Sequence, residues 1–131
     1  MRRRNPYRFE ISFAYIAGPL VMALELWRRW GDFANPAFWD DYFYFTIAIY
    51  AAYLLSKRKY SGQLLWLYAC GIGTFMIWFS LFFSLHTYSE GDVSGIAMPY
   101  VIAFKLTGSL IIGLMSVRAF NFLRHKPRFP A

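Results

Sequence analysis

Charged side chains are scarce in this sequence: Asp, Glu, Lys and Arg make up 16% of its 131 residues, while 58% are hydrophobic. A domain surrounded by water needs more charge than this on its surface, so the composition favours lipid as the solvent over the alternative of an unusually aromatic soluble bundle. Aromatic residues reach 22%, with 14 Phe and 10 Tyr, and such side chains suit acyl chains and membrane interfaces. The composition therefore predicts an all-α integral membrane protein.

Cysteine and histidine are almost absent. A single cysteine, Cys70, excludes an intramolecular disulfide and every metal site built from several cysteines, and its place in an apolar run predicts a packing role. The two histidines, His86 and His125, fall on opposite sides of the membrane in the expected topology, so one chain cannot use both for one metal or haem. We expect no metal and no cofactor, although bound lipid is compatible with this composition.

Groupings that carry catalysis are also missing from the sequence. It has no nucleophile beside a base, no paired carboxylates at membrane depth and no glycine-rich phosphate loop, since Gly71-Ile72-Gly73 fits helix packing. We therefore do not expect an enzyme.

Four apolar stretches approach the roughly 20 residues that a membrane-spanning helix needs. The third is the clearest, because no charged residue occurs from Gln63 to Leu85. Asn5-Pro6 and Asn35-Pro36 are typical of helix starts, since Asn can cap free amides and Pro fits the first helical position. The sequence predicts one domain, an antiparallel up-down bundle of four transmembrane helices at about residues 6–30, 36–56, 62–85 and 96–123.

The basic residues carry a topology signal. A formal charge of +7 would favour nucleic acid only if the positive side chains formed one continuous face, and they do not. Eleven of the 14 Lys and Arg residues fall in three short stretches beside the spans. This placement predicts that both termini face the cytoplasm, as in a bacterial inner membrane.

Small residues mark the helix faces expected to pack. Lipid provides little hydrophobic drive for helix association, so packed faces favour side chains that allow close approach. The third span places such residues at spacings of three and four, which keeps one stripe against a partner helix. The expected helix-packing seam consists of Gly18, Gly73, Ser80, Ser84, Gly108, Ser109 and Gly113.

Lys105 is the most informative residue, because a charge inside a membrane usually faces a partner or a cavity. Helical side chains lean toward the N-terminus of their helix, so the Lys105 and Glu25 heads should converge at similar depth. We expect an intramembrane Glu25–Lys105 ion pair, extended by Asp41, which is either structural or a ligand or partner site. The alternatives are that Lys105 reaches the headgroups and that Glu25 pairs with Arg28 or Arg29.

The outer side should carry an acidic cluster. Acidic groups at the start of the second span complement the positive end of a helix, which explains Asp40 and Asp41. The functional alternative is a vestibule for cations or cationic ligands. The expected outer acidic cluster consists of Asp32, Asp40, Glu90 and Asp92.

Three functions are compatible with these observations. The first is a non-catalytic accessory or scaffolding subunit that docks onto another membrane protein or onto itself, with no nucleic-acid partner. The second is a small oligomeric transporter or channel with Glu25 and Lys105 in the membrane, because the chain resembles small multidrug transporters in size and helix count. The third is a binder of lipid, quinone or pigment between aromatic-lined helices.

Overall fold

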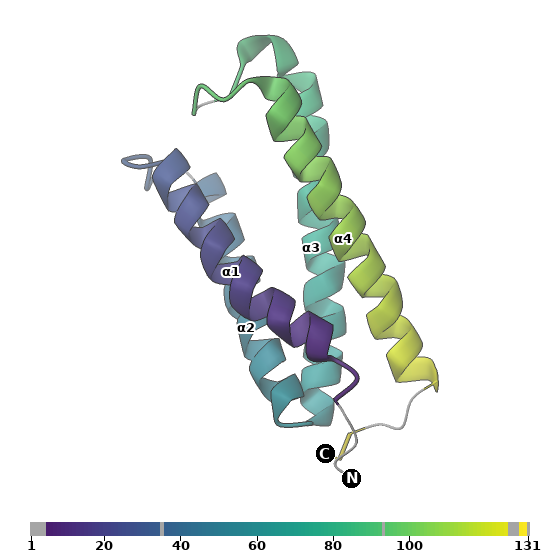
Figure 1. The fold of residues 1–131 in the computed structure, drawn as a ribbon. Helices are drawn as coiled ribbons and strands as arrows, with labels where there is room; N and C mark the ends of the chain where they lie inside the picture. The colour runs from purple at the N-terminus through teal and green to yellow at the C-terminus, as the bar shows by residue number, and fades with distance from the viewer. Residues whose placement is uncertain (1–4, 35, 93, 126–128, 131) are drawn as a thin grey trace.

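The computed structural model describes residues 5–34, 36–92, 94–125 and 129–130 of the chain. Four long helices follow one another, with a single turn of 3-10 helix, η1 (Tyr88–Glu90), before the last of them (Figure 1). The helices are α1 (Arg8–Arg28), α2 (Pro36–Ser56), α3 (Tyr60–His86) and α4 (Met98–His125). The prediction of an all-helical chain is therefore confirmed, with helix boundaries within a few residues of those expected.

Three of the helices, α1, α3 and α4, are long and apolar enough to cross a membrane. The helix α2 contains Trp39, Asp40, Asp41 and several tyrosines, which lower its mean hydropathy. Large apolar side chains on all four helices point outward, among them Phe75 of α3, which is 71% exposed. An outward surface of this kind is compatible with lipid as the solvent.

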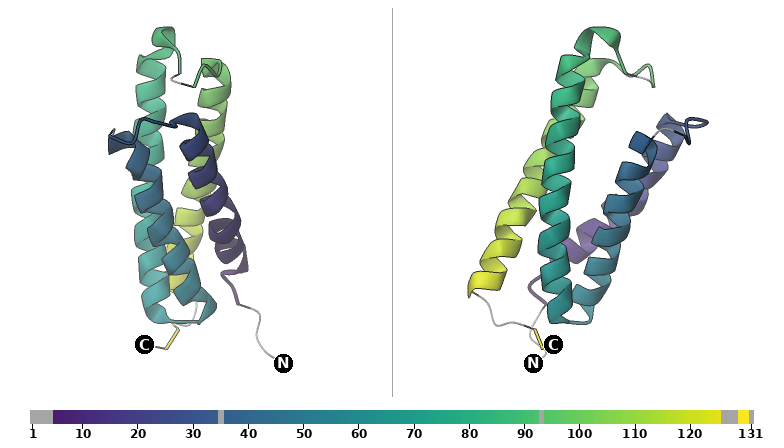
Figure 2. Two further views of the ribbon diagram at one scale, coloured as in Figure 1. Left: turned by 90° about the vertical axis from the view of Figure 1, so that its left-hand side faces the viewer. Right: turned by 180° about the vertical axis from the view of Figure 1, so that it is seen from behind.

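The helices pack in sequential order, α1 against α2, α2 against α3 and α3 against α4. Both termini lie at the end of the molecule that also holds the α2–α3 turn, and we call this the terminal end (Figure 1). The α1–α2 and α3–α4 connections lie at the opposite end, which we call the loop end. The α1–α2 pair and the α3–α4 pair meet near the terminal end and separate toward the loop end (Figures 1 and 2).

Close approach of α2 and α3 depends on two glycines. A Cβ at Gly73 would lie 2.5 Å from Cε2 of the Tyr44 ring, and one at Gly62 would lie 2.7 Å from the backbone nitrogen of Leu55. A side chain at Gly62 would meet the backbone of α2 and push the two helices apart, and one at Gly73 would displace the Tyr44 ring. The turn between them closes with Arg58 at a φ of 56°, while Lys59 N donates to Leu54 O and Arg58 N donates to Leu55 O, the usual arrangement of a left-handed helix end.

Two other glycines of the expected seam also lie at helix contacts. A Cβ at Gly18 of α1 would approach Ile49 of α2 to 3.0 Å, and one at Gly108 of α4 would approach Ile77 of α3 to 2.6 Å. By contrast, nothing lies within 4 Å of a Cβ built at Gly113. Gly113 therefore points away from the packing between helices of this chain.

Candidate functional site

The Asp, Glu, Lys and Arg residues within the helices gather toward the two ends of the bundle. At the loop end, charges from α1, α2, α4 and the α3–α4 connection lie within electrostatic reach of one another. We call them the loop-end cluster, and its members are Glu25, Arg28, Arg29, Asp41, Asp92 and Lys105. Three are acidic and three are basic, so the cluster is formally neutral.

Glu25 binds both arginines of this cluster. Its side chain is 7% exposed, and its carboxylate accepts a 3.1 Å bond from Nη1 of Arg28 and contacts Nε of Arg29. These partners lie three and four residues later on the same helix, where side chains are neighbours. Arg28 Nε also lies 3.3 Å from Oδ2 of Asp92, so one arginine links α1 to the α3–α4 connection.

Lys105 binds to α3. Its ammonium donates to Oγ of Ser84 at 2.6 Å and to the backbone oxygen of Ser80 at 3.2 Å. Among the described residues, no direct contact joins Lys105 to Glu25. The two residues therefore have partners other than those of the expected Glu25–Lys105 pair. The physical reason is that α1 and α4 separate toward this end, while each residue has polar groups closer by (Figure 1).

The remaining residues of the expected sites are dispersed. Asp41 is partly buried and senses the charges of Glu25 and Arg28, whereas Asp32, Asp40 and Glu90 are exposed. Ser109 is buried, and its hydroxyl donates to Leu106 O within its own helix. Asp92 of the expected outer acidic cluster forms an ion pair with Arg28.

The environment of Asp92 lowers its pKa. Partial burial acts to raise the pKa, but the hydroxyl and backbone N–H of Ser94 both donate to Oδ2, and the Arg28 guanidinium lies beside it. These bonds and this charge favour the ionised carboxylate and outweigh the burial. The α3–α4 connection is thus held as an anion against the end of α1.

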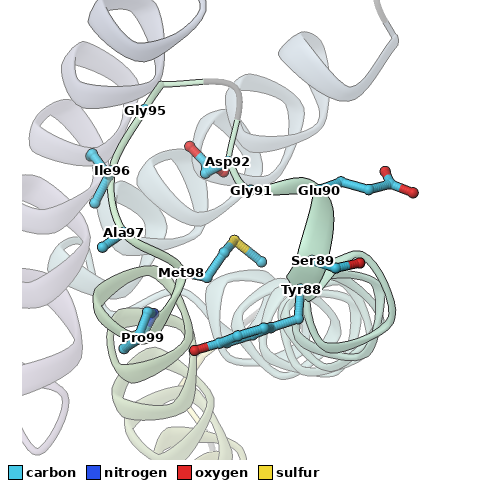
Figure 3. Close-up of a pocket in the computed structure, with 10 residues that line it drawn as sticks. All are labelled: Tyr88, Ser89, Glu90, Gly91, Asp92, Gly95, Ile96, Ala97, Met98 and Pro99. Atoms are coloured by element: carbon cyan, nitrogen blue, oxygen red, sulfur yellow. The ribbon is translucent and has the colours of Figure 1, made fainter.

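A shallow hollow of about 380 Å³ lies over this connection (Figure 3). Met98 lies toward its middle, the Tyr88 ring extends beside Pro99, and the Glu90 carboxylate points away from it. A second hollow, of about 470 Å³, lies along the exposed side of α2 between Trp39 and Ile47 and is almost wholly apolar. Within the described residues, no three His, Cys, Asp or Glu side chains lie close enough together to share a metal.

A second cluster, at the terminal end, was not expected from the sequence. Glu10 of α1 is fully buried, and its Oε1 accepts a 2.8 Å bond from Nε of Arg118 of α4. Beside them, Nε2 of Gln63 donates to the Tyr7 hydroxyl at 3.2 Å. We call Tyr7, Glu10, Gln63, Trp66 and Arg118 the terminal-end cluster. The sequence signal for this cluster was Glu10 in the first turn of a span. A carboxylate at this position also stabilises the start of a helix, so the signal did not indicate a contact with α4.

The terminal-end cluster joins segments from both ends of the chain. Oε1 of Gln63 accepts from the backbone N–H of Phe129 at 3.0 Å, while the rings of Tyr7 and Phe122 pack edge to face at 4.9 Å. The side chain of Asn5 donates to Leu55 O at 2.9 Å. Two buried polar atoms of the cluster, Glu10 Oε2 and Trp66 Nε1, have no hydrogen-bond partner among the described residues. The cluster thus fixes α1, α3 and α4 to one another where the helices converge.

His86 and His125 are the last residues of α3 and α4, which end at opposite ends of the bundle (Figure 1).

No protein-family model, no curated protein and no solved structure matches this chain.

Proposed function

We propose that α2 crosses the membrane together with α1, α3 and α4, with both termini in the cytoplasm of a bacterial cell. Two observations support this topology. The helix α2 packs between α1 and α3 and connects their opposite ends (Figure 1). The described basic residues outside the loop-end cluster belong to segments at the terminal end, which favours a cytoplasmic location for that end: Arg8, Lys57, Arg58, Lys59, Arg118 and Arg124.

We further propose that the protein is an accessory or scaffolding subunit that docks onto another membrane protein. The observation that carries this proposal is that charged groups of the spans bind within the chain. Glu10 binds Arg118, Glu25 binds Arg28 and Arg29, and Lys105 binds α3. The Glu10–Arg118 and Lys105–Ser84 bonds join different helices and favour a stable platform, and the outward surface left for a partner is apolar and aromatic.

The exposed face of α3 is the best location for such a partner. Gly71, Phe75, Phe79 and Phe82 follow one another at spacings of four, four and three, so they lie on one strip of the helix. The rings of Phe75 and Phe79 stack at 6.3 Å between centroids, and nothing lies within 4 Å of a Cβ built at Gly71. Glycine beside large rings offers a hole and knobs to a partner helix.

Gentle extraction from the native membrane tests this proposal. We expect the protein to elute with a second membrane protein in fixed stoichiometry. Phe75→Ala combined with Phe79→Ala should release the partner without changing the thermal unfolding of the protein, because both rings are exposed. Phe104→Ala, which removes a ring that is 62% exposed on α4, is the matched control. A wild-type protein that elutes alone, as a monomer, would contradict the accessory role.

A small oligomeric transporter is the second candidate. It is favoured by the loop-end cluster, in which six charges surround the region where the helix pairs separate. A chain of this size needs several copies to enclose a path, so a homo-oligomer without a foreign subunit would favour transport.

A further inference from the structure

Arg118 has the most exposed side chain of the ion-paired arginines in the described part of the chain, and its guanidinium is only partly used. Its side chain is 40% exposed, and Nε binds Glu10. The two Nη groups form no hydrogen bond within the part of the chain that the structure describes. A guanidinium presents five N–H donors in a planar fork, so four remain available for another acceptor.

Neighbouring rings restrict how an acceptor can approach. The guanidinium carbon lies 5.8 Å from the centroid of the Phe9 ring and 5.2 Å from that of Phe122. The rings occupy space beside the guanidinium, whose N–H bonds all point outward in its own plane. An acceptor must therefore reach Arg118 in that plane, in the manner of a phosphate or carboxylate.

Two more polar side chains lie between Arg118 and the C-terminal end of α4. Asn121 and His125 follow it by three and seven residues, so all three lie on one strip of α4, and Asn121 and His125 are exposed. At 1.5 Å rise per residue the strip is about 10 Å long. It begins at the level of the first turn of α1, because Arg118 contacts Glu10 there.

The same strip becomes apolar in the other direction. Ile111 and Leu114 precede Arg118 by seven and four residues and are 36% and 61% exposed. One side of α4 thus presents apolar side chains toward the centre of the span and hydrogen-bond donors near its end. This order of apolar and polar groups along the helix matches that of a phospholipid, with acyl chains against Ile111 and Leu114 and a phosphate at Arg118.

We propose that Arg118, Asn121 and His125 form a binding site for the phosphate headgroup of an anionic phospholipid. The charge of this end favours an anionic lipid over a zwitterionic one, because Glu10 is the single acidic residue in the terminal-end segments and it is buried. In the site, Nε of Arg118 holds Glu10 while its Nη groups and the Asn121 amide donate to phosphate oxygens. The lipid then lies between α1 and α4.

This inference requires that α4 crosses a membrane, and it is independent of the docking partner. The test uses the full chain, purified in mild detergent and supplied with phosphatidylglycerol or phosphatidylcholine, with native mass spectrometry to count the bound lipids. We expect one phosphatidylglycerol to be retained in preference to phosphatidylcholine. Arg118→Lys keeps the charge and removes the fork, and Asn121→Leu removes an exposed amide. Each should weaken retention about fivefold, the effect of losing one hydrogen bond of typical strength.

Arg8→Gln is the matched control. Arg8 is exposed in the first turn of α1, and at 100° per residue it points about 160° away from Glu10 around that helix, so its loss should weaken retention less than Arg118→Lys does. Equal retention of the two lipids would overturn the proposal, as would equal losses for Arg8→Gln and Arg118→Lys. Displacement of the lipid by millimolar inorganic phosphate would also overturn it, because the site would then serve a free anion.

Discussion

Glu10 and Arg118 are 108 positions apart in the sequence and join the first and last helices through a 2.8 Å bond between Oε1 and Nε. The carboxylate is fully buried, whereas the guanidinium is partly exposed. Loss of either partner therefore has unequal consequences. Without Arg118 a buried carboxylate has no cation beside it, while without Glu10 the guanidinium still reaches the surface.

Arg118→Met should lower the free energy of unfolding by about 3 kcal/mol, because an uncompensated buried charge remains. The double variant Glu10→Gln with Arg118→Met should recover more than half of this loss, since the buried group is then neutral. Thermal unfolding in detergent measures both. A double variant that is less stable than Arg118→Met would show that the charge on Glu10 is not the source of the cost.

Gly73→Ala should lower the free energy of unfolding by about 1–3 kcal/mol, because the added methyl group overlaps the Tyr44 ring. Gly71→Ala, two residues earlier, adds the same methyl group where nothing lies within 4 Å. It should not lower stability. Comparison of the two midpoints of thermal unfolding isolates the overlap, and equal midpoints would contradict the tight α2–α3 contact.

Ser84→Ala should destabilise the protein by about 1.5 kcal/mol, because the Lys105 ammonium loses its 2.6 Å acceptor. In the Ser84→Ala background, Lys105→Met should be better tolerated than in the wild type. A double-mutant cycle between Glu25→Gln and Lys105→Met should give a smaller coupling energy than one between Ser84→Ala and Lys105→Met, because only the second pair is in direct contact. A larger coupling energy for the first pair would restore the direct Glu25–Lys105 pair.

Acid should weaken the link between Arg28 and Asp92. The folded pKa of Asp92 is lowered from its ordinary value of 3.8, so its contribution to stability is fully present well above pH 3.8 and is lost as pH falls through the lower, folded pKa. Asp92→Asn should remove this part of the pH dependence. Thermal unfolding of both proteins between pH 6 and pH 3 measures it, and identical pH profiles would contradict the role of Asp92.

Composition and segment length alone predicted an all-helical chain with helices long and apolar enough to cross a membrane. Long apolar stretches between short basic ones predict membrane helices, because lipid requires backbone groups to bond within each segment. The helix boundaries followed for the same reason. Small residues also predicted Gly18, Gly73 and Gly108 as positions of close approach, since spacing along a helix identifies a face. Spacing could not show that Gly113 lies away from the helix contacts, because this depends on where the neighbouring helix lies.

Only the tertiary structure decided the partners of the charges. The sequence placed Glu25 and Lys105 at similar depth, but depth along a helix does not specify the angle at which helices diverge. Because the two helix pairs separate toward the loop end, Glu25 binds its own helix and Lys105 binds α3. The same geometry brings α1 and α4 together at the other end, where Glu10 meets Arg118. A contact between the two ends of the chain depends on how the helices cross, which no local spacing encodes.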